Sequence, residues 1–309
     1  MRRDRLWLYL QVSLFLCASC FAQATHKLSF RASNTQFDVT VPDGELTASD
    51  KELQTYIAQG ARAVATYFGR FPMTHVNINL RAVSGDKVRF GRSSPMNGGT
   101  IMMMVGRDAK ADAFESDWTL THEMVHLAFP ATKGDNHEWL GEGMATYVEP
   151  IARAQAGLIS DREVWRQFAE YMSRGLPRPN DPGIDEARGI GRVYWGGALF
   201  CLMADVEIRK QTHNRKGLQD AFRAIMRDGG TMDGTMEYEW SIDTIFETGD
   251  KATGTHVLAN LYRDWKNGPG EVDLPKLWKQ LGIEKSSDSI TFRADAPLAA
   301  IRKAITARR

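Results

Sequence analysis

Two histidines four residues apart are the feature that most restricts how this chain folds. The segment THEMVHLAFP, residues 121–130, contains His122, Glu123 and His126 and ends at Pro130. Residues i and i+4 of an α-helix lie on one face, so the two imidazoles would stand one above the other. Ring nitrogens one helical turn apart can reach a single ion, and Glu123 is then placed to take a proton from a water bound to it. The segment predicts a metal-binding helix that ends just before Pro130.

The pattern alone does not decide the chemistry, because three fixed positions also arise by chance. We expect the helix to begin near Ser116 or Asp117, residue types that favour helix N-termini. Leu120, Met124 and Leu127 would form its buried stripe with or without a metal. The alternative is an ordinary helix with two solvated or hydrogen-bonded histidines. A third ligand would distinguish the two interpretations.

A candidate third ligand follows sixteen residues after His126. The segment EWLGEGMATYVEP, residues 138–150, has helical periodicity up to Pro150 and places Glu142 between two glycines. Each glycine costs a helix about 1 kcal/mol relative to alanine, which favours a position where backbone and ligands crowd against an ion. Catalytic zinc uses three protein ligands and an open position, and His₂Glu is a recurring set. The predicted ligands of one Zn²⁺ per chain are His122, His126 and Glu142.

These motifs resemble a known enzyme group. HEMVH followed by WLGEGMATYVE is similar to the gluzincin zinc metallopeptidases, in particular the aminopeptidase N and glycyl aminopeptidase families, whose second motif reads W-x-x-E-G-x-A-x-Y. Residues 193–225 are similar to the Y-x-K-G-A segment and following helix of those enzymes, so the resemblance covers roughly residues 115–226. The roles that it implies are zinc ligation by His122, His126 and Glu142, general base catalysis by Glu123, and oxyanion stabilisation by Tyr194.

The resemblance implies an α+β fold of the thermolysin-like zincin type. Its mixed α/β N-terminal lobe and mainly α-helical C-terminal lobe would enclose a zinc cleft between them. The hydrophobic pattern agrees, and the expected elements are strands at 26–30, 36–41, 75–83, 98–106 and around 289–292, with a helix at 49–68 and mostly helices after residue 113. We expect residues 25–129 to form the first lobe, ending in the HExxH helix, and residues 130–309 to form the lobe that carries the third ligand.

Residues 1–24 have the composition of a secretory signal peptide. MRRDR is basic, LWLYLQVSLFLCA is apolar, and AQA ending at Ala24 is a small-x-small cleavage site. The apolar run is shorter than the roughly 20 residues of a membrane-spanning helix. We expect a secreted or periplasmic chain without stable membrane insertion after cleavage near Ala24. Lipidation at Cys20 is less favoured, because Cys17 stands where a leucine is usual.

Cleavage changes the charge and the cysteine content. It removes three arginines and one aspartate, so the net charge falls from +1 to −1. Such a balance does not attract nucleic acid or anionic lipid. Of the three cysteines only Cys201 remains, so no intrachain disulfide can form.

The sequence departs from the family in the region expected to bind substrate. The lysine of Y-x-K-G is Gly196, and residues 93–105 lack the glutamate with which aminopeptidase N relatives hold a free amino group. An aminopeptidase must pair that ammonium, because an unpaired buried charge is costly. The carboxylates that the sequence leaves open for this role are Asp86, Asp108, Glu115 and Glu138.

The apolar segment GGTIMMMVG suggests a second way of binding substrate. Bounded by glycines, it reads as a strand whose edge could pair with an extended peptide backbone. The substrate-binding residues predicted on this basis are Gly98, Gly99, Thr100 and Ile101.

The leading hypothesis is an exported zinc-dependent peptidase, with aminopeptidase and endopeptidase activity both left open. The alternative is a zinc-containing peptide-binding protein without turnover, but a site that only binds has no need of Glu123. A structural helical protein with accidental histidines is disfavoured by the Gly-Glu-Gly segment. The sequence does not determine the physiological substrate, the oligomeric state or the role of residues 230–309.

Overall fold

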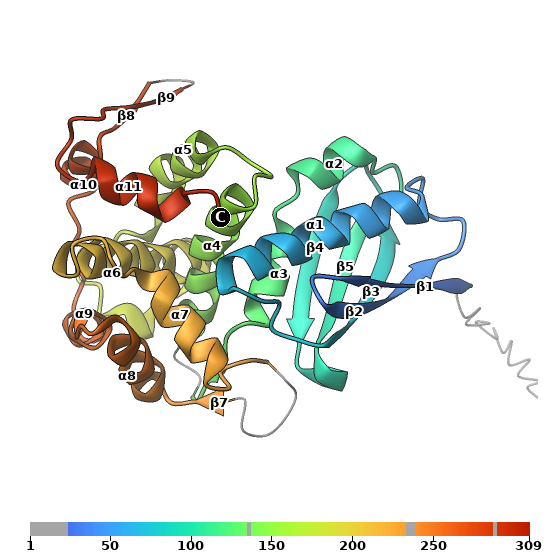
Figure 1. Ribbon diagram of the computed structural model, residues 1–309, viewed down its shortest axis with the longest axis horizontal. Coiled ribbons are helices and arrows are strands. Elements are labelled where there is room, and N and C mark those ends of the chain that lie inside the picture. The colour runs from blue at the N-terminus through green and yellow to red at the C-terminus, as the bar shows by residue number, and fades with distance from the viewer. Residues whose placement is uncertain (1–23, 135–136, 233–238, 287–288) are drawn as a thin grey trace, which may run out of the picture.

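The computed structural model describes residues 24–134, 137–232, 239–286 and 289–309. It comprises a five-stranded sheet at the N-terminal side and packed helices that form the rest (Figure 1). The signal peptide predicted at residues 1–24 lies outside the described residues except for Ala24. Within the described ranges, no helix is both long and apolar enough to cross a membrane.

The sheet has the strand order β1-β2-β3-β5-β4. The strands are β1 (Thr25–Ala32), β2 (Thr35–Pro42), β3 (His75–Val83), β4 (Val88–Ser94) and β5 (Thr100–Gly106). β3 runs parallel to β2 and β5, whereas the outer strands β1 and β4 pair antiparallel with their neighbours. The four strands predicted before residue 113 are confirmed, but β4 was not predicted.

β5 lies inside the sheet and not at its edge. Thr100 is paired with Asn77 of β3 on one side and with Ser94 of β4 on the other, and Ile101 is fully buried. The predicted pairing of substrate with Thr100 and Ile101 is therefore wrong, because both neighbouring strands already use the backbone of β5. Gly98 and Gly99 precede β5, and their role in substrate binding stays a prediction. The free edge on this side of the sheet belongs to β4.

The α-helices are numbered in chain order. They are α1 (Asp50–Phe68), α2 (Ala111–Ser116), α3 (Thr119–His126), α4 (Glu138–Gln155), α5 (Asp161–Tyr171), α6 (Gly197–Gln211), α7 (Leu218–Arg227), α8 (Ile242–Thr253), α9 (Val257–Lys266), α10 (Leu274–Leu281) and α11 (Ala299–Thr306). The short strands β6 (Ala131–Thr132) and β7 (Glu239–Trp240) pair with each other, as do β8 (Ile283–Lys285) and β9 (Ile290–Phe292).

Two helix boundaries differ from the sequence prediction. The HExxH helix α3 is shorter than expected at both ends, because α2 is a separate helix and α3 already ends at His126. The Asp117 carboxylate accepts a hydrogen bond from the Leu120 N–H at 3.0 Å, so it satisfies a free donor at the start of α3. By contrast, α4 continues through Pro150 to Gln155.

α1 lies across one face of the sheet and connects it to the helices (Figure 1). The helix agrees with the predicted span of 49–68. The carbonyl of Tyr67, near its C-terminus, accepts hydrogen bonds from the side chains of Gln219 and Arg223 on α7, both at 2.6 Å. The last carbonyls of a helix have no intrahelical donor, so these two bonds satisfy α1 and hold the helices against the sheet.

α4 and α6 cross with their backbones in direct contact. A Cβ at Gly143 would lie 2.3 Å from the Cα of Gly197, and a Cβ at Gly197 would lie 2.0 Å from the carbonyl oxygen of Trp139. The predicted reason for Gly143, crowding against an ion, is therefore wrong, because this glycine permits the helix crossing. Nothing lies within 4 Å of a Cβ built at Gly141.

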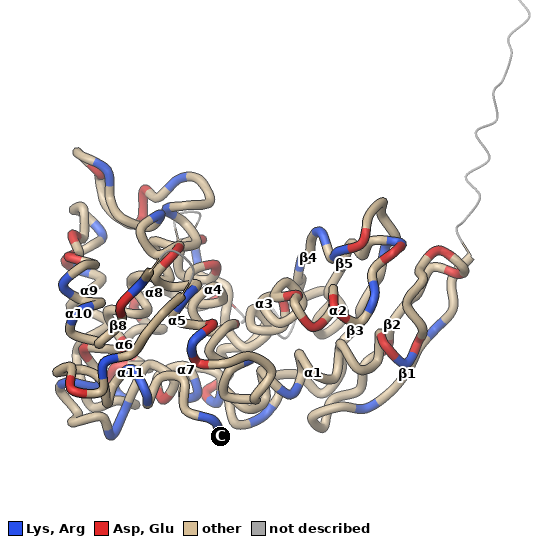
Figure 2. The backbone as a smooth tube through the Cα atoms, turned by 90° about the horizontal axis from the view of Figure 1, so that it is seen from above, with Lys and Arg blue, Asp and Glu red and all other residues tan. Residues whose placement is uncertain are grey.

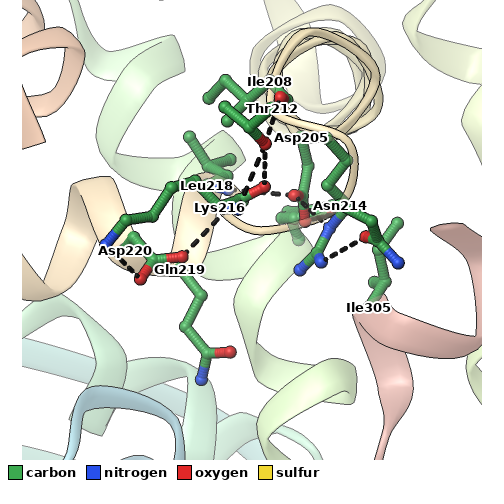
Figure 3. A network of polar contacts seen from close by, with 12 residues as sticks. Asp205, Ile208, Thr212, Asn214, Lys216, Leu218, Gln219, Asp220 and Ile305 are labelled. Carbon is green, nitrogen blue, oxygen red and sulfur yellow. Dashed lines mark hydrogen bonds and ion pairs between the residues drawn. The ribbon is translucent and has the colours of Figure 1, made fainter. Parts of the chain in front are cut away.

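A buried carboxylate fixes the same group of helices. Asp205 on α6 accepts hydrogen bonds from the Tyr147 hydroxyl of α4 at 2.9 Å and from Arg209 Nε at 2.7 Å. It also accepts a hydrogen bond from the N–H of Leu218 at the start of α7 at 2.9 Å, and Figure 3 shows these two residues close together. Burial of a charge is costly unless it is paired and hydrogen-bonded. These bonds supply that pairing and tie α4, α6 and α7 together.

We predict that Gly143→Ala lowers the free energy of unfolding by about 1–3 kcal/mol, because the new methyl group must push two helix backbones apart. Gly141→Ala is the matched control on the same helix, and it should leave stability unchanged or raise it by up to about 1 kcal/mol through helix propensity. Denaturant titration of the metal-free proteins measures both effects. Equal stabilities for the two variants would contradict the proposed role of the helix crossing.

Candidate functional site

α3 lies between the sheet and α4 (Figure 2). The predicted zinc ligands are His122 and His126 on α3 and Glu142 on α4. His122 Nε2 lies 3.2 Å from Glu142 Oε2 and 3.2 Å from His126 Nε2. His126 Nε2 lies 3.4 Å from the same Glu142 oxygen. The structure thus brings the three predicted ligands to one point, and we call this group the ligand triad.

The separations within the triad fit a single tetrahedral ion. Ligand atoms about 2.0–2.1 Å from a tetrahedral zinc lie about 3.3–3.4 Å from one another. Two imidazole nitrogens 3.2 Å apart share at most one proton, so a cation satisfies the group more completely than hydrogen bonds do. No other combination of three His, Cys, Asp or Glu side chains in the described ranges meets the requirements of a metal site.

The surroundings of the triad act on its protonation states. Burial lowers the pKa of His122, which favours the neutral imidazole that a metal requires. Burial opposes ionisation of Glu142, but its hydrogen bonds with both histidines outweigh burial and lower its pKa well below the usual range. For His126, burial would lower the pKa, yet the hydrogen bond with Glu142 raises it. The triad therefore carries an ionised carboxylate at neutral pH.

Within the part of the chain that the structure describes, His122 lacks a hydrogen bond that metal-bound histidines commonly make through their second ring nitrogen. Metal-bound histidines usually donate their second ring N–H to a carboxylate or carbonyl. The buried Nδ1 of His122 has no hydrogen-bond partner among the described residues. The orientation of this ring instead comes from packing, with Trp118 edge-on at 5.4 Å and Tyr194 parallel at 6.0 Å between ring centroids.

Glu123 is buried between α3 and the edge of the sheet. Its Oε2 accepts a hydrogen bond from the Ser93 N–H of β4 at 2.7 Å. A Cβ at Gly91 would lie 2.7 Å from Glu123 Cγ, so glycine allows β4 to come this close. Because the Ser93 N–H points away from β5, antiparallel geometry turns the Ser93 carbonyl outward as well. The free edge of β4 therefore runs beside Glu123.

Tyr194 lies on a π-helical segment, Gly191–Gly196, that leads directly into α6. Its ring plane is within 9° of the His122 ring plane. Burial, followed by the nearby Glu142 charge, raises the pKa of Tyr194 well above its usual value, so its hydroxyl remains a donor at neutral pH. π-helical turns occur frequently at functional sites.

A pocket of about 360 Å³ opens beside the triad on the His126 side. Its lining includes Glu142 together with Pro130, Thr132, Glu138 and Gly141. The missing side chain at Gly141 leaves this space open. We call this space the acidic pocket, because it contains Glu138 and Glu142 and no lysine or arginine of the described residues lines it.

Sequence reasoning missed three residues at the site. Ser93 acts through its backbone N–H, which has no side-chain signature, and Gly91 was not placed on a strand. Trp118 is 51% exposed beside His122. It precedes His122 by four residues, so helical spacing was a signal that could have found it.

The fold is shared with known zinc metallopeptidases. An aminopeptidase N family protein from Idiomarina loihiensis superposes with a TM-score of 0.64 and 16% sequence identity, covering 88% of this chain and 53% of that protein. An M1 zinc metallopeptidase from Deinococcus radiodurans superposes with a TM-score of 0.51 and 16% identity, covering 81% and 54% of the two chains. The predicted resemblance to the aminopeptidase N family is confirmed at the level of the fold.

The chain spans about half the length of the solved structures that it matches. No protein-family model matches the sequence, and no curated protein matches it in sequence.

We predict that Glu142→Ala weakens zinc binding by at least about a hundredfold, because even residues that support a ligand contribute about 10–100-fold. His137→Ala is the control: His137 Nε2 lies 3.7 Å from Asp185 Oδ1 and is not part of the triad. Metal content by mass spectrometry after dialysis against a weak chelator measures both. Retention of zinc by Glu142→Ala would show that the third ligand lies elsewhere.

Proposed function

We propose that this chain is a zinc-dependent peptidase that hydrolyses peptide bonds. The observation that carries the proposal is the arrangement at one place of the ligand triad, the buried carboxylate of Glu123 and the free edge of β4. A site that only stored metal has no use for a carboxylate held beside a sheet edge. The fold shared with zinc metallopeptidases supports the same function.

Each residue of the site has a separate role in the proposed reaction. Zinc held by the triad would lower the pKa of a water to about 7 and polarise the scissile carbonyl. Glu123 takes a proton from the attacking water and delivers it to the leaving amine. Oε2 of Glu123 accepts a hydrogen bond from the Ser93 N–H, which leaves Oε1 for these proton transfers. Tyr194 donates its hydroxyl proton in a hydrogen bond to the developing oxyanion.

The substrate backbone is proposed to lie along β4 in the cleft between the sheet and the helices. An extended peptide adds to a free strand edge through main-chain hydrogen bonds. The Ser93 N–H is already bonded to Glu123, so the outward carbonyl of Ser93 offers such a bond next to Glu123. This assigns to β4 the role that the sequence suggested for β5. Pairing of this kind serves both an aminopeptidase and an endopeptidase.

We also propose that the enzyme works outside the cytoplasm. The support is the basic and then apolar composition of residues 1–24 with a cleavage site at Ala24. One zinc ion per chain and a peptide or protein substrate complete the proposal.

The test is mass spectrometry of a peptide pool after incubation with the zinc-loaded chain, residues 25–309. Half of the pool carries free N-termini and half carries blocked N-termini. We expect cleavage by the unmodified chain and none by Glu123→Gln, which keeps the triad and should keep its metal. The products distinguish trimming of free ends from internal cutting. Cleavage by Glu123→Gln at the full rate would remove Glu123 from the mechanism, and zinc binding without any cleavage would favour a peptide-binding protein.

A second prediction isolates the contact between β4 and Glu123. Ser93→Pro removes the N–H that holds the carboxylate, on an edge strand where proline is tolerated. We expect kcat/KM to fall about tenfold, which corresponds to loss of one charge-assisted hydrogen bond. Ser93→Ala keeps the N–H and should retain the unmodified rate. A similar rate for both variants would show that this hydrogen bond does not position Glu123.

A further inference from the structure

The edge of β4 offers no anion to a positively charged substrate group. Between Val88 and Ser94 the strand contains two arginines, Arg89 and Arg92, and no acid. A cationic group of a substrate lying along this edge must therefore be paired by another part of the site. The sequence left four carboxylates open for such a role.

The structure separates these four carboxylates. Asp86 precedes β4, at the end of the strand that is far from Glu123. Asp108 lies near Asp86, because the Asp108 N–H donates a hydrogen bond to the Gly85 carbonyl at 3.0 Å. Glu115 lines a different pocket, formed with Tyr56 and Arg153. Only Glu138, of the four, lines the acidic pocket beside the triad.

Glu138 is positioned to face that pocket. It is the first residue of α4 and precedes Glu142 by four residues, so both side chains lie on one helix face. The side chain is exposed, and no described residue forms an ion pair or hydrogen bond with it. Glu142 is committed to the triad, which leaves Glu138 as the available carboxylate among the described residues that line the pocket.

One partly buried carboxylate contacts the side chains of both neighbours of Glu138. Asp185 accepts hydrogen bonds from the Trp139 indole at 2.9 Å and from the Tyr262 hydroxyl at 2.6 Å. His137 Nε2 lies 3.7 Å from the same group. The neighbours of Glu138 are thus held in place while its own side chain stays free for a ligand.

We infer that Glu138 pairs with a cationic amine of the bound peptide on the His126 side of the triad. This inference rests on the proposed function and names its substrate class: peptides with a free N-terminal ammonium, or with a lysine or arginine side chain, next to the cut bond. Among the described lining residues no lysine or arginine competes for Glu138, and charge-assisted hydrogen bonds are stronger than neutral ones.

The test measures binding in the zinc-loaded Glu123→Gln background, so that it does not depend on turnover. The probe is the peptide of the pool that binds best, made in three forms: free N-terminus with norleucine, acetylated with norleucine, and acetylated with lysine. We expect one cationic form to bind about tenfold more tightly than the neutral form. Adding Glu138→Gln should reduce that ratio to about one. If Glu138→Gln removes the preference for a free N-terminus, the group that pairs with Glu138 is the N-terminal ammonium. If it removes the preference for lysine, that group is the lysine side chain.

The control is Asp243→Asn, which removes the same charge from the first turn of α8. It should leave the ratio unchanged. The inference is overturned if the background variant shows no preference for a cation, if Glu138→Gln keeps the preference, or if it weakens charged and neutral peptides equally, as a purely structural role in α4 would. Failure of the proposed function appears separately, as an unmodified zinc-loaded chain that binds these peptides and cuts none of them.

Discussion

The packing of α4 is the constraint on which the rest of the site depends. Backbone contact between Gly143 and Gly197 sets how deeply this helix lies, and Asp205 fixes it through Tyr147. A neighbouring face of the helix then presents Glu142 to α3 at 3.2 Å from His122. The geometry of the triad is therefore a property of the buried core and not of a surface loop, which suits a site that must be arranged before its substrate arrives.

The sequence predicted the parts of the site that are set by spacing along a single helix. Spacing i to i+4 places His122 and His126 on one face, and a carboxylate in the next periodic segment completed the set. It could not reveal β4, because VRFGRSS lacks the alternation of a half-buried strand and contributes a backbone N–H at Ser93. The role of Gly143 was misread for a related reason, since its partner Gly197 lies on another helix and no local pattern encodes that contact.

The strand beside Glu123 and the acidic pocket differ in charge. β4 carries Arg89 and Arg92 and no acid, whereas the acidic pocket contains Glu138 and Glu142. In the proposed function, a peptide that lies along β4 and reaches this pocket would meet acidic side chains at one end only, and complementary charges favour one orientation over the reverse. The direction of the bound chain would then depend on this charge as well as on pairing with the strand.

The π-helical segment Gly191–Gly196 allows Tyr194 two separate positions and none between them. A π-helical turn contains one residue more than an α-helical turn. Without that residue the segment would join α6 as a regular helix, and everything before the deletion would turn by about 100° around the axis. No small adjustment connects the two states. Among proteins of this fold, insertions or deletions at this point would therefore move the tyrosine into or out of the site in a single step.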